Sequence, residues 1–132
     1  MLICFSICLT GCSDPAKEMR LNQEFPDWPE LQKLQSDEIL MPVGTAIDFG
    51  DMNSAKQELK NPGLKAALDA FEASSIPSGF DTEERKAAKE KAVKSFREAI
   101  ELAESNGSSD KIKTAYEQAQ EALRTVSAPL EN

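Results

Sequence analysis

Three cysteines carry the most reactive side chains in the sequence, and Cys4, Cys8 and Cys12 all fall within its first twelve positions. A thiolate is a good nucleophile and metal ligand, but a catalytic thiol is usually activated by a neighbouring base, most often a His. The sequence contains no His. Cys–His and Ser–His–Asp arrangements are therefore excluded, and the commonest protein ligand of transition metals is missing.

The cysteines belong to a short apolar stretch. Residues 2–11, LICFSICLTG, carry no charged side chain. They are too few for a helix that spans ~30 Å of hydrocarbon, but they match the apolar part of a signal peptide. A short buried helix with incidental cysteines is the alternative. The end of the stretch, Leu9-Thr10-Gly11-Cys12, resembles the lipobox of bacterial lipoproteins, in which a small residue precedes an acylated Cys.

The lipobox resemblance implies that residues 1–11 are removed as a signal peptide and that Cys12 is lipidated. Two or three acyl chains such as palmitate, at ~0.8 kcal/mol per buried CH₂, hold a protein stably at a membrane. In lipoprotein sorting, an Asp directly after the Cys retains the protein in the inner membrane. Ser13 stands there, so the periplasmic face of the outer membrane is favoured. No Lys or Arg precedes the apolar stretch, and this departure from the pattern is explained if translation starts further upstream.

Carboxylates are the other groups that could do chemistry. The chain has 23 acidic residues, and no spacing singles out a pair typical of a hydrolase. Asp48, Asp51 and Asn53 do not form a calcium loop, because their spacing is wrong and the terminal Glu is absent. We predict instead that Asn53 or Ser54 caps a helix. We expect no catalytic residue, no metal and no cofactor, and the net charge of −8 disfavours nucleic acid as a partner.

We expect residues 12–28 to form a lipidated tether, because the sequence after Cys12 is polar up to residue 24. Near its end, Phe25 and Trp28 have two interpretations. They form an exposed binding spot, or they fix the entry of the chain onto a hydrophobic core, and we favour the core.

The first half of the body predicts short helices. Pro29 suits the first turn of a helix over about 29–36, and residues 39–43, ILMPV, predict a buried crossing segment rather than a strand. A helix over about 54–60 is expected to stop at Asn61, which caps the next helix. The apolar face of that next helix is expected to contain Leu64, Ala67, Leu68 and Phe71.

The second half predicts two longer helices joined at residues 106–109, NGSS. The first should run over about 82–105, with a carboxylate cap at Asp81 and Glu84 three residues later. Its apolar face repeats at Ala88, Ala92, Phe96, Ala99 and Ala103, and that of the second helix at Ile112, Ala115, Tyr116, Ala119, Leu123 and Val126. The pattern predicts an antiparallel hairpin within an all-α domain over 29–132, most plausibly a bundle of four helices.

The final hairpin resembles the closing helices of the cytochrome c-prime family, in which an Ala-Tyr precedes a C-x-x-C-H haem motif. Here Ala115-Tyr116 is followed by Leu123 and Val126 at the positions of the two haem-linking cysteines and by Ser127 at that of the iron-ligating His. The resemblance implies the bundle fold, and the loss of all three residues argues against haem. We expect Tyr116 to be a core residue with its hydroxyl at the edge, not a ligand.

The sequence thus predicts a non-enzymatic, membrane-anchored extracytoplasmic lipoprotein. Its helical domain would act as a binding or scaffolding module for an unidentified protein or small molecule, and the membrane would be reached through the lipid on Cys12. The alternative is a haem-free bundle of the cytochrome c-prime type, retained as a small-molecule sensor or a spacer. This alternative predicts an apolar cavity near Leu123 and Val126.

Overall fold

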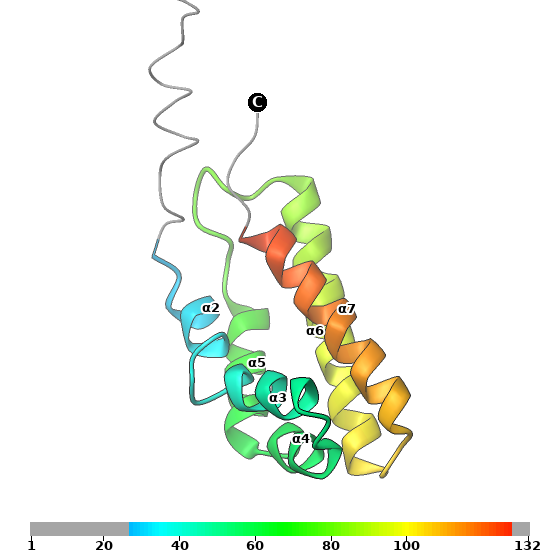
Figure 1. The fold of residues 1–132 in the computed structure, drawn as a ribbon. Helices are drawn as coiled ribbons and strands as arrows, with labels where there is room; N and C mark the ends of the chain where they lie inside the picture. Colours follow the sequence, from blue (N-terminus) through cyan, green and yellow to red (C-terminus); the bar gives the residue numbers. More distant parts are fainter. Residues whose placement is uncertain (1–26, 128–132) are drawn as a thin grey trace, which may run out of the picture. The chain divides into compact units, whose positions relative to one another are not determined.

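The computed structural model describes residues 27–127, and this part of the chain contains six α-helices and no strand (Figure 1). Residues 27–126 form one compact unit. The helices are α2 (Pro29–Leu34), α3 (Leu40–Asp48), α4 (Met52–Leu59), α5 (Pro62–Ala73), α6 (Glu83–Glu104) and α7 (Ser109–Val126). The predicted all-α class is therefore confirmed. The predicted signal peptide, Cys12 and most of the tether lie outside the described residues.

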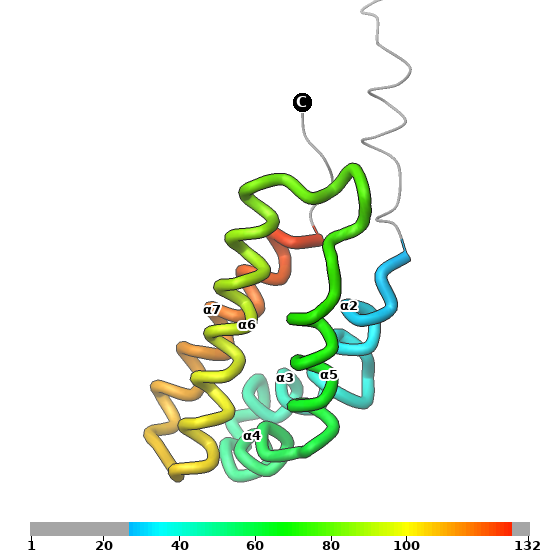
Figure 2. The backbone as a smooth tube through the Cα atoms, turned by 180° about the vertical axis from the view of Figure 1, so that it is seen from behind, coloured from blue at the N-terminus to red at the C-terminus, as the bar shows by residue number. Residues whose placement is uncertain are grey.

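The two longest helices, α6 and α7, form the predicted antiparallel hairpin, and both views show them side by side (Figures 1 and 2). Small residues let the helices approach closely, and Ala92, Ala99 and Ala119 are fully buried in the contact. The turn between them is a Schellman motif. Asn106 takes the left-handed conformation with φ of 56°, and the Gly107 amide donates to the Leu102 carbonyl at 2.6 Å.

A second pair of helices, α2 and α5, packs around Trp28. The indole ring is buried and lies 5.2 Å from the Phe71 ring, and its Nε1 donates to Ser74 Oγ at 2.9 Å. The core interpretation of Trp28 is therefore confirmed, whereas Phe25 lies outside the described residues. Asn61 caps α5 as predicted, because its Oδ1 accepts from the Gly63 amide at 2.9 Å.

Residues 39–43 differ from the prediction of a crossing segment, because four of them belong to helix α3. Pro42 is tolerated since it lies in the first turn of the helix, where an amide would have no partner within the helix. The expectation that the whole segment is buried is wrong at Met41, which is 54% exposed. Leu40 and Val43 face the core instead. Helix α3 is therefore an additional helix that the sequence did not predict, and the described residues contain six helices where a bundle of four was expected.

The cap of α4 is Asp51, not Asn53 or Ser54. Its carboxylate accepts from the Ser54 amide at 3.1 Å and from the Ser54 hydroxyl at 2.7 Å. The hydrogen bonds from Ser54 hold the pKa of the fully exposed Asp51 carboxyl below its ordinary value. Helix α4 therefore begins two residues earlier than predicted.

Helix α6 begins at Glu83, whereas a cap at Asp81 would start the helix at residue 82. Thr82 is the cap, and its Oγ1 accepts from the Arg85 amide at 3.2 Å. Position N3 of the helix is then Arg85 instead of Glu84, so no reciprocal capping box forms. The Arg85 side chain is buried and reaches across to the end of α7, where its Nε donates to the Val126 carbonyl at 3.0 Å.

Candidate functional site

The residues that the sequence singled out are Cys12, Tyr116, Leu123 and Val126, and the structure describes the last three. Cys12 lies outside the described residues. Leu123 and Val126 are fully buried, and neither lines any of the surface hollows described below. The cavity that the cytochrome-like alternative requires beside them is therefore not supported. Tyr116 is buried, as predicted, but its hydroxyl end borders a surface groove.

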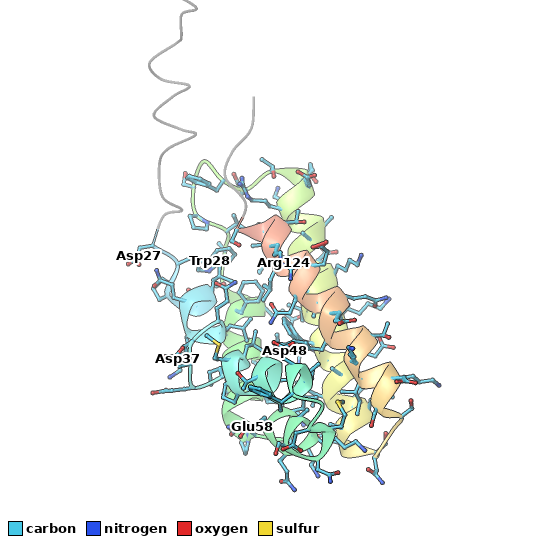
Figure 3. The ribbon with its side chains drawn as sticks, viewed as in Figure 1. Asp27, Trp28, Asp37, Asp48, Glu58 and Arg124 are labelled. Atoms are coloured by element: carbon cyan, nitrogen blue, oxygen red, sulfur yellow. The ribbon has the colours of Figure 1, made fainter. Side chains whose placement is uncertain are left out.

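The groove lies between α3 and α7 and has a volume of about 700 Å³. Figure 3 labels one residue on each border, Asp48 on α3 and Arg124 on α7. Its lining combines apolar and polar side chains from both helices and from the segment before α3: Gln35, Leu40, Met41, Gly44, Thr45, Ile47, Asp48, Tyr116, Glu117, Gln120, Glu121 and Arg124.

Tyr116 forms the inner end of the groove. Its ring meets the buried Phe96 ring edge-on, with the centroids 6.0 Å apart. The hydroxyl donates to the Leu40 carbonyl at 3.4 Å and accepts a short hydrogen bond from Gln120 Nε2. Burial is the main cause that raises the pKa of the Tyr116 phenol, and the negative charge of Asp48 raises it further. The phenol is therefore a neutral group at physiological pH.

Gly44 permits this position of the Tyr116 hydroxyl. A Cβ atom placed on Gly44 would lie 2.9 Å from Tyr116 Oη, which is closer than real Cβ contacts. The missing side chain thus lets α3 and α7 meet at the groove floor.

Helix α3 and its cap leave two large apolar side chains in solvent, one of which lines the groove. Among the described residues, the exposed large hydrophobic side chains are Met41 and Phe49, at 54% and 84% exposure. Met41 lies in the first turn of α3 and Phe49 is its C-terminal cap, eight residues later. At 100° per residue, the two side chains lie within about 80° of each other around the helix axis. We call the side of α3 that carries these two side chains its apolar face; the exposed Thr45 lies between them, and Met41 lines the groove whereas Phe49 does not.

The groove is acidic. Its lining contains the carboxylates of Asp48, Glu117 and Glu121 and one guanidinium, that of Arg124, which leaves a net charge of −2. The guanidinium is already paired, because Arg124 Nη1 lies 2.8 Å from Glu121 Oε2. The chain between Lys33 and Lys56, which contains α3, carries four acidic residues and no basic one.

A second hollow of about 780 Å³ lies beside α6 near the end of α5, and it has a different character. Two of its three cations, Arg97 and Lys89, contact groups of α5 and of the residue that follows it. Arg97 pairs with Asp69 at 2.8 Å and with Glu72, and these hydrogen bonds raise the pKa of its guanidinium. Lys89 Nζ donates to the Glu72 and Ser74 carbonyls at the end of α5, and burial lowers the pKa of its ammonium. These contacts fix α5 on α6.

The described residues 27–127 contain no group of three or more Cys, Asp or Glu residues placed to hold a metal ion. Over the same range, no helix is both long and apolar enough to cross a membrane.

Comparisons with protein families, curated proteins and solved structures found no match to this chain.

Sequence reasoning missed four residues that shape the structure. Met41, Gly44 and Phe49 belong to a segment without an obvious period, and only Leu40, Val43 and Ile47, at spacings of 3 and 4, indicate its helix. Arg85 stands among the many charged residues of α6, yet its side chain is buried. Its signal is positional: it precedes Ala88 and Ala92 by 3 and 7 residues, so it falls on the apolar stripe of α6.

Proposed function

We propose that this protein is a lipid-anchored, non-enzymatic binding module of a bacterial membrane surface, and that the α3–α7 groove is its binding site. The observation that carries the binding half is the pairing of a groove with the two exposed large apolar side chains, Met41 and Phe49. Large apolar side chains exposed together on one helix and bordered by polar residues favour a site for a partner or ligand.

The groove supports binding better than catalysis. A catalytic site needs a nucleophile, acid or base whose reactivity is tuned by its surroundings. Burial raises the pKa of the Tyr116 phenol in this groove. The phenol is therefore a weaker acid near neutral pH than an exposed tyrosine, which does not favour acid–base catalysis. Apolar area, hydrogen-bonding groups such as Gln120 and fixed negative charge are what the groove offers a partner.

The anchoring half of the proposal rests on the sequence Leu9-Thr10-Gly11-Cys12 and its resemblance to a lipobox. Acylation at Cys12 would hold the groove at the membrane and raise its local concentration for partners on the same surface. Ser13 favours the periplasmic face of the outer membrane as the location.

Replacing the anchor thiol tests the proposed localisation. The full chain is expressed in a bacterium and labelled with radioactive palmitate, as wild type and as the Cys12→Ser and Cys8→Ser variants. Cys8 is the matched control, because it is a thiol of the same apolar stretch outside the lipobox position. We expect label and membrane partition to be lost only in Cys12→Ser. Unchanged membrane partition and labelling of Cys12→Ser would refute the anchor.

A further inference from the structure

We propose that the α3–α7 groove binds a basic amphipathic helix of a protein partner. This inference rests on the proposed binding function and names the chemistry of its ligand. Three features of the described residues support it: the length of the apolar face, the sign of the charges around it, and the poor fit of other occupants.

The apolar face has the length of two helical turns. Met41 and Phe49 are eight residues apart on α3, which corresponds to about 12 Å along the helix axis. A partner helix presents apolar residues i and i+7 about 10 Å apart on one face. Such a helix lying along α3 would cover both exposed side chains. Residues between its two ends would enter the groove above Tyr116.

The charges around this face require a basic partner. Asp48 directly precedes Phe49 at the end of α3, and Glu117 and Glu121 follow the opposite border on α7. The one cation of the lining, Arg124, is paired with Glu121 and does not compensate the other two carboxylates. Lys or Arg residues flanking the apolar stripe of a partner helix would meet Asp48 on one side and Glu117 on the other.

A second copy of the chain fits this surface poorly. A symmetric dimer would bury the same patch on both subunits and would bring Asp48 and Glu117 of one copy against the acidic groove of the other. An anionic lipid surface fits poorly for the same reason, since fixed carboxylates are repelled by it. A basic helix supplies the missing charge as well as the apolar contact.

A binding experiment with designed peptides tests the inference. The protein is the full chain carrying Cys12→Ser, so that no attached lipid or micelle competes for an amphipathic probe. The probe is a dye-labelled peptide of about 18 residues, long enough to be helical, with Leu on one face and Lys beside it. Two further peptides serve as controls: one has the same composition in scrambled order, and one has every Lys replaced by Glu.

Two pairs of substitutions separate the apolar and charged contributions of the groove. Met41→Ser with Phe49→Ser removes the apolar face, and Asp48→Asn with Glu117→Gln removes two negative charges. The matched control is Glu90→Gln with Glu98→Gln, which removes two negative charges from exposed positions of α6. All six positions are exposed, so the variants should keep the circular dichroism spectrum of the wild type.

We expect fluorescence anisotropy to show that the Lys peptide binds at least about tenfold more tightly than either control peptide. The apolar variant should weaken binding about tenfold or more, and the charge variant about fivefold with a smaller salt dependence. The α6 control should change affinity less than about twofold.

Several results would overturn the inference: no binding of the Lys peptide, equal binding of the Glu peptide, or equal loss in the α6 control. Self-association that Phe49→Ser abolishes would assign the groove to a second copy. Binding to anionic vesicles that the same substitution abolishes would assign it to a membrane. None of these results alters the palmitate labelling at Cys12, so failure of the anchor and failure of this inference are distinguishable.

Discussion

A methyl group added to Gly44 should report directly on how α3 and α7 meet. The Cβ of Gly44→Ala would lie 2.9 Å from Tyr116 Oη, whereas the next ring atom, Cζ, is 3.7 Å away. The clash is therefore confined to one oxygen atom. Because that oxygen is held by the Leu40 carbonyl and by Gln120, it cannot move away without losing hydrogen bonds.

Two opposing effects determine how much Gly44→Ala changes the free energy of unfolding when Tyr116 is present. Replacing Gly by Ala inside a helix stabilises it by about 1 kcal/mol, and Gly44 lies in the middle of α3. Forcing an extra methyl group into a packed contact costs about 1–3 kcal/mol. We therefore expect Gly44→Ala to range from nearly neutral to about 2 kcal/mol destabilising.

The sign of the effect should reverse when the oxygen is removed. In a Tyr116→Phe background, the closest remaining ring atom to the new methyl group lies 3.7 Å away, an ordinary van der Waals contact. Gly44→Ala should then stabilise the protein by up to about 1 kcal/mol. The double-mutant cycle should give a coupling energy of about 1–3 kcal/mol between positions 44 and 116.

Urea denaturation of the four proteins, followed by circular dichroism and by the fluorescence of the single Trp, measures each free energy of unfolding. Thr45→Ala is the matched control, since Thr45 is the exposed neighbour of Gly44 on α3 and should show the same effect in both backgrounds. If Gly44→Ala changes the stability equally with and without the hydroxyl, within about 0.5 kcal/mol, the proposed contact does not exist.

Two further predictions concern buried polar groups. Arg85→Met should lower the free energy of unfolding by about 2–3 kcal/mol, because the carbonyls of Val126 and Phe80 lose a charged donor. Lys86→Met on the exposed side of α6 should change it by less than about 0.5 kcal/mol, and equal effects would contradict a special role of Arg85. Tyr116→Phe should reduce the loss in the free energy of unfolding that the protein shows at alkaline pH. Burial raises the pKa of this phenol in the folded protein, so its contribution is complete below the unfolded pKa of about 10 and is lost as the pH rises through the folded value. Denaturant titrations from pH 8 to about 11 test this, and parallel pH profiles of the two proteins would refute it.

The hairpin could be predicted from sequence because its determinants are local. The apolar positions of α6 and α7 repeat at spacings of 3 and 4, and every residue predicted for the two faces is buried. The turn is encoded by Asn106 and Gly107, and the start of α5 by Asn61 and Pro62. Each of these signals acts within a few residues, so propensity and tertiary packing favour the same structure.

The groove could not be predicted because its determinants are far apart in the chain. Gly44 and Pro42 argue locally against a helix, but the close approach of Tyr116, 72 positions later, makes a small residue at position 44 necessary. The exposure of Met41 depends in the same way on which face of α3 the remainder of the domain covers. The burial of Arg85 could not be predicted either, because a charged side chain on an apolar stripe is buried only if acceptors such as the Val126 carbonyl are present.

The fold of α3 does not need Met41 and Phe49, and this is itself an argument for a binding surface. Leu40, Val43 and Ile47 supply the buried contacts of the helix. Met41 and Phe49 add little to the core, because most of each side chain is in solvent. Polar residues at these two positions would leave the core intact and improve solubility, so stability alone does not explain why two large apolar side chains occupy one face of a helix otherwise flanked by carboxylates. A partner that covers this face would explain both the apolar side chains and the uncompensated acidic residues around them.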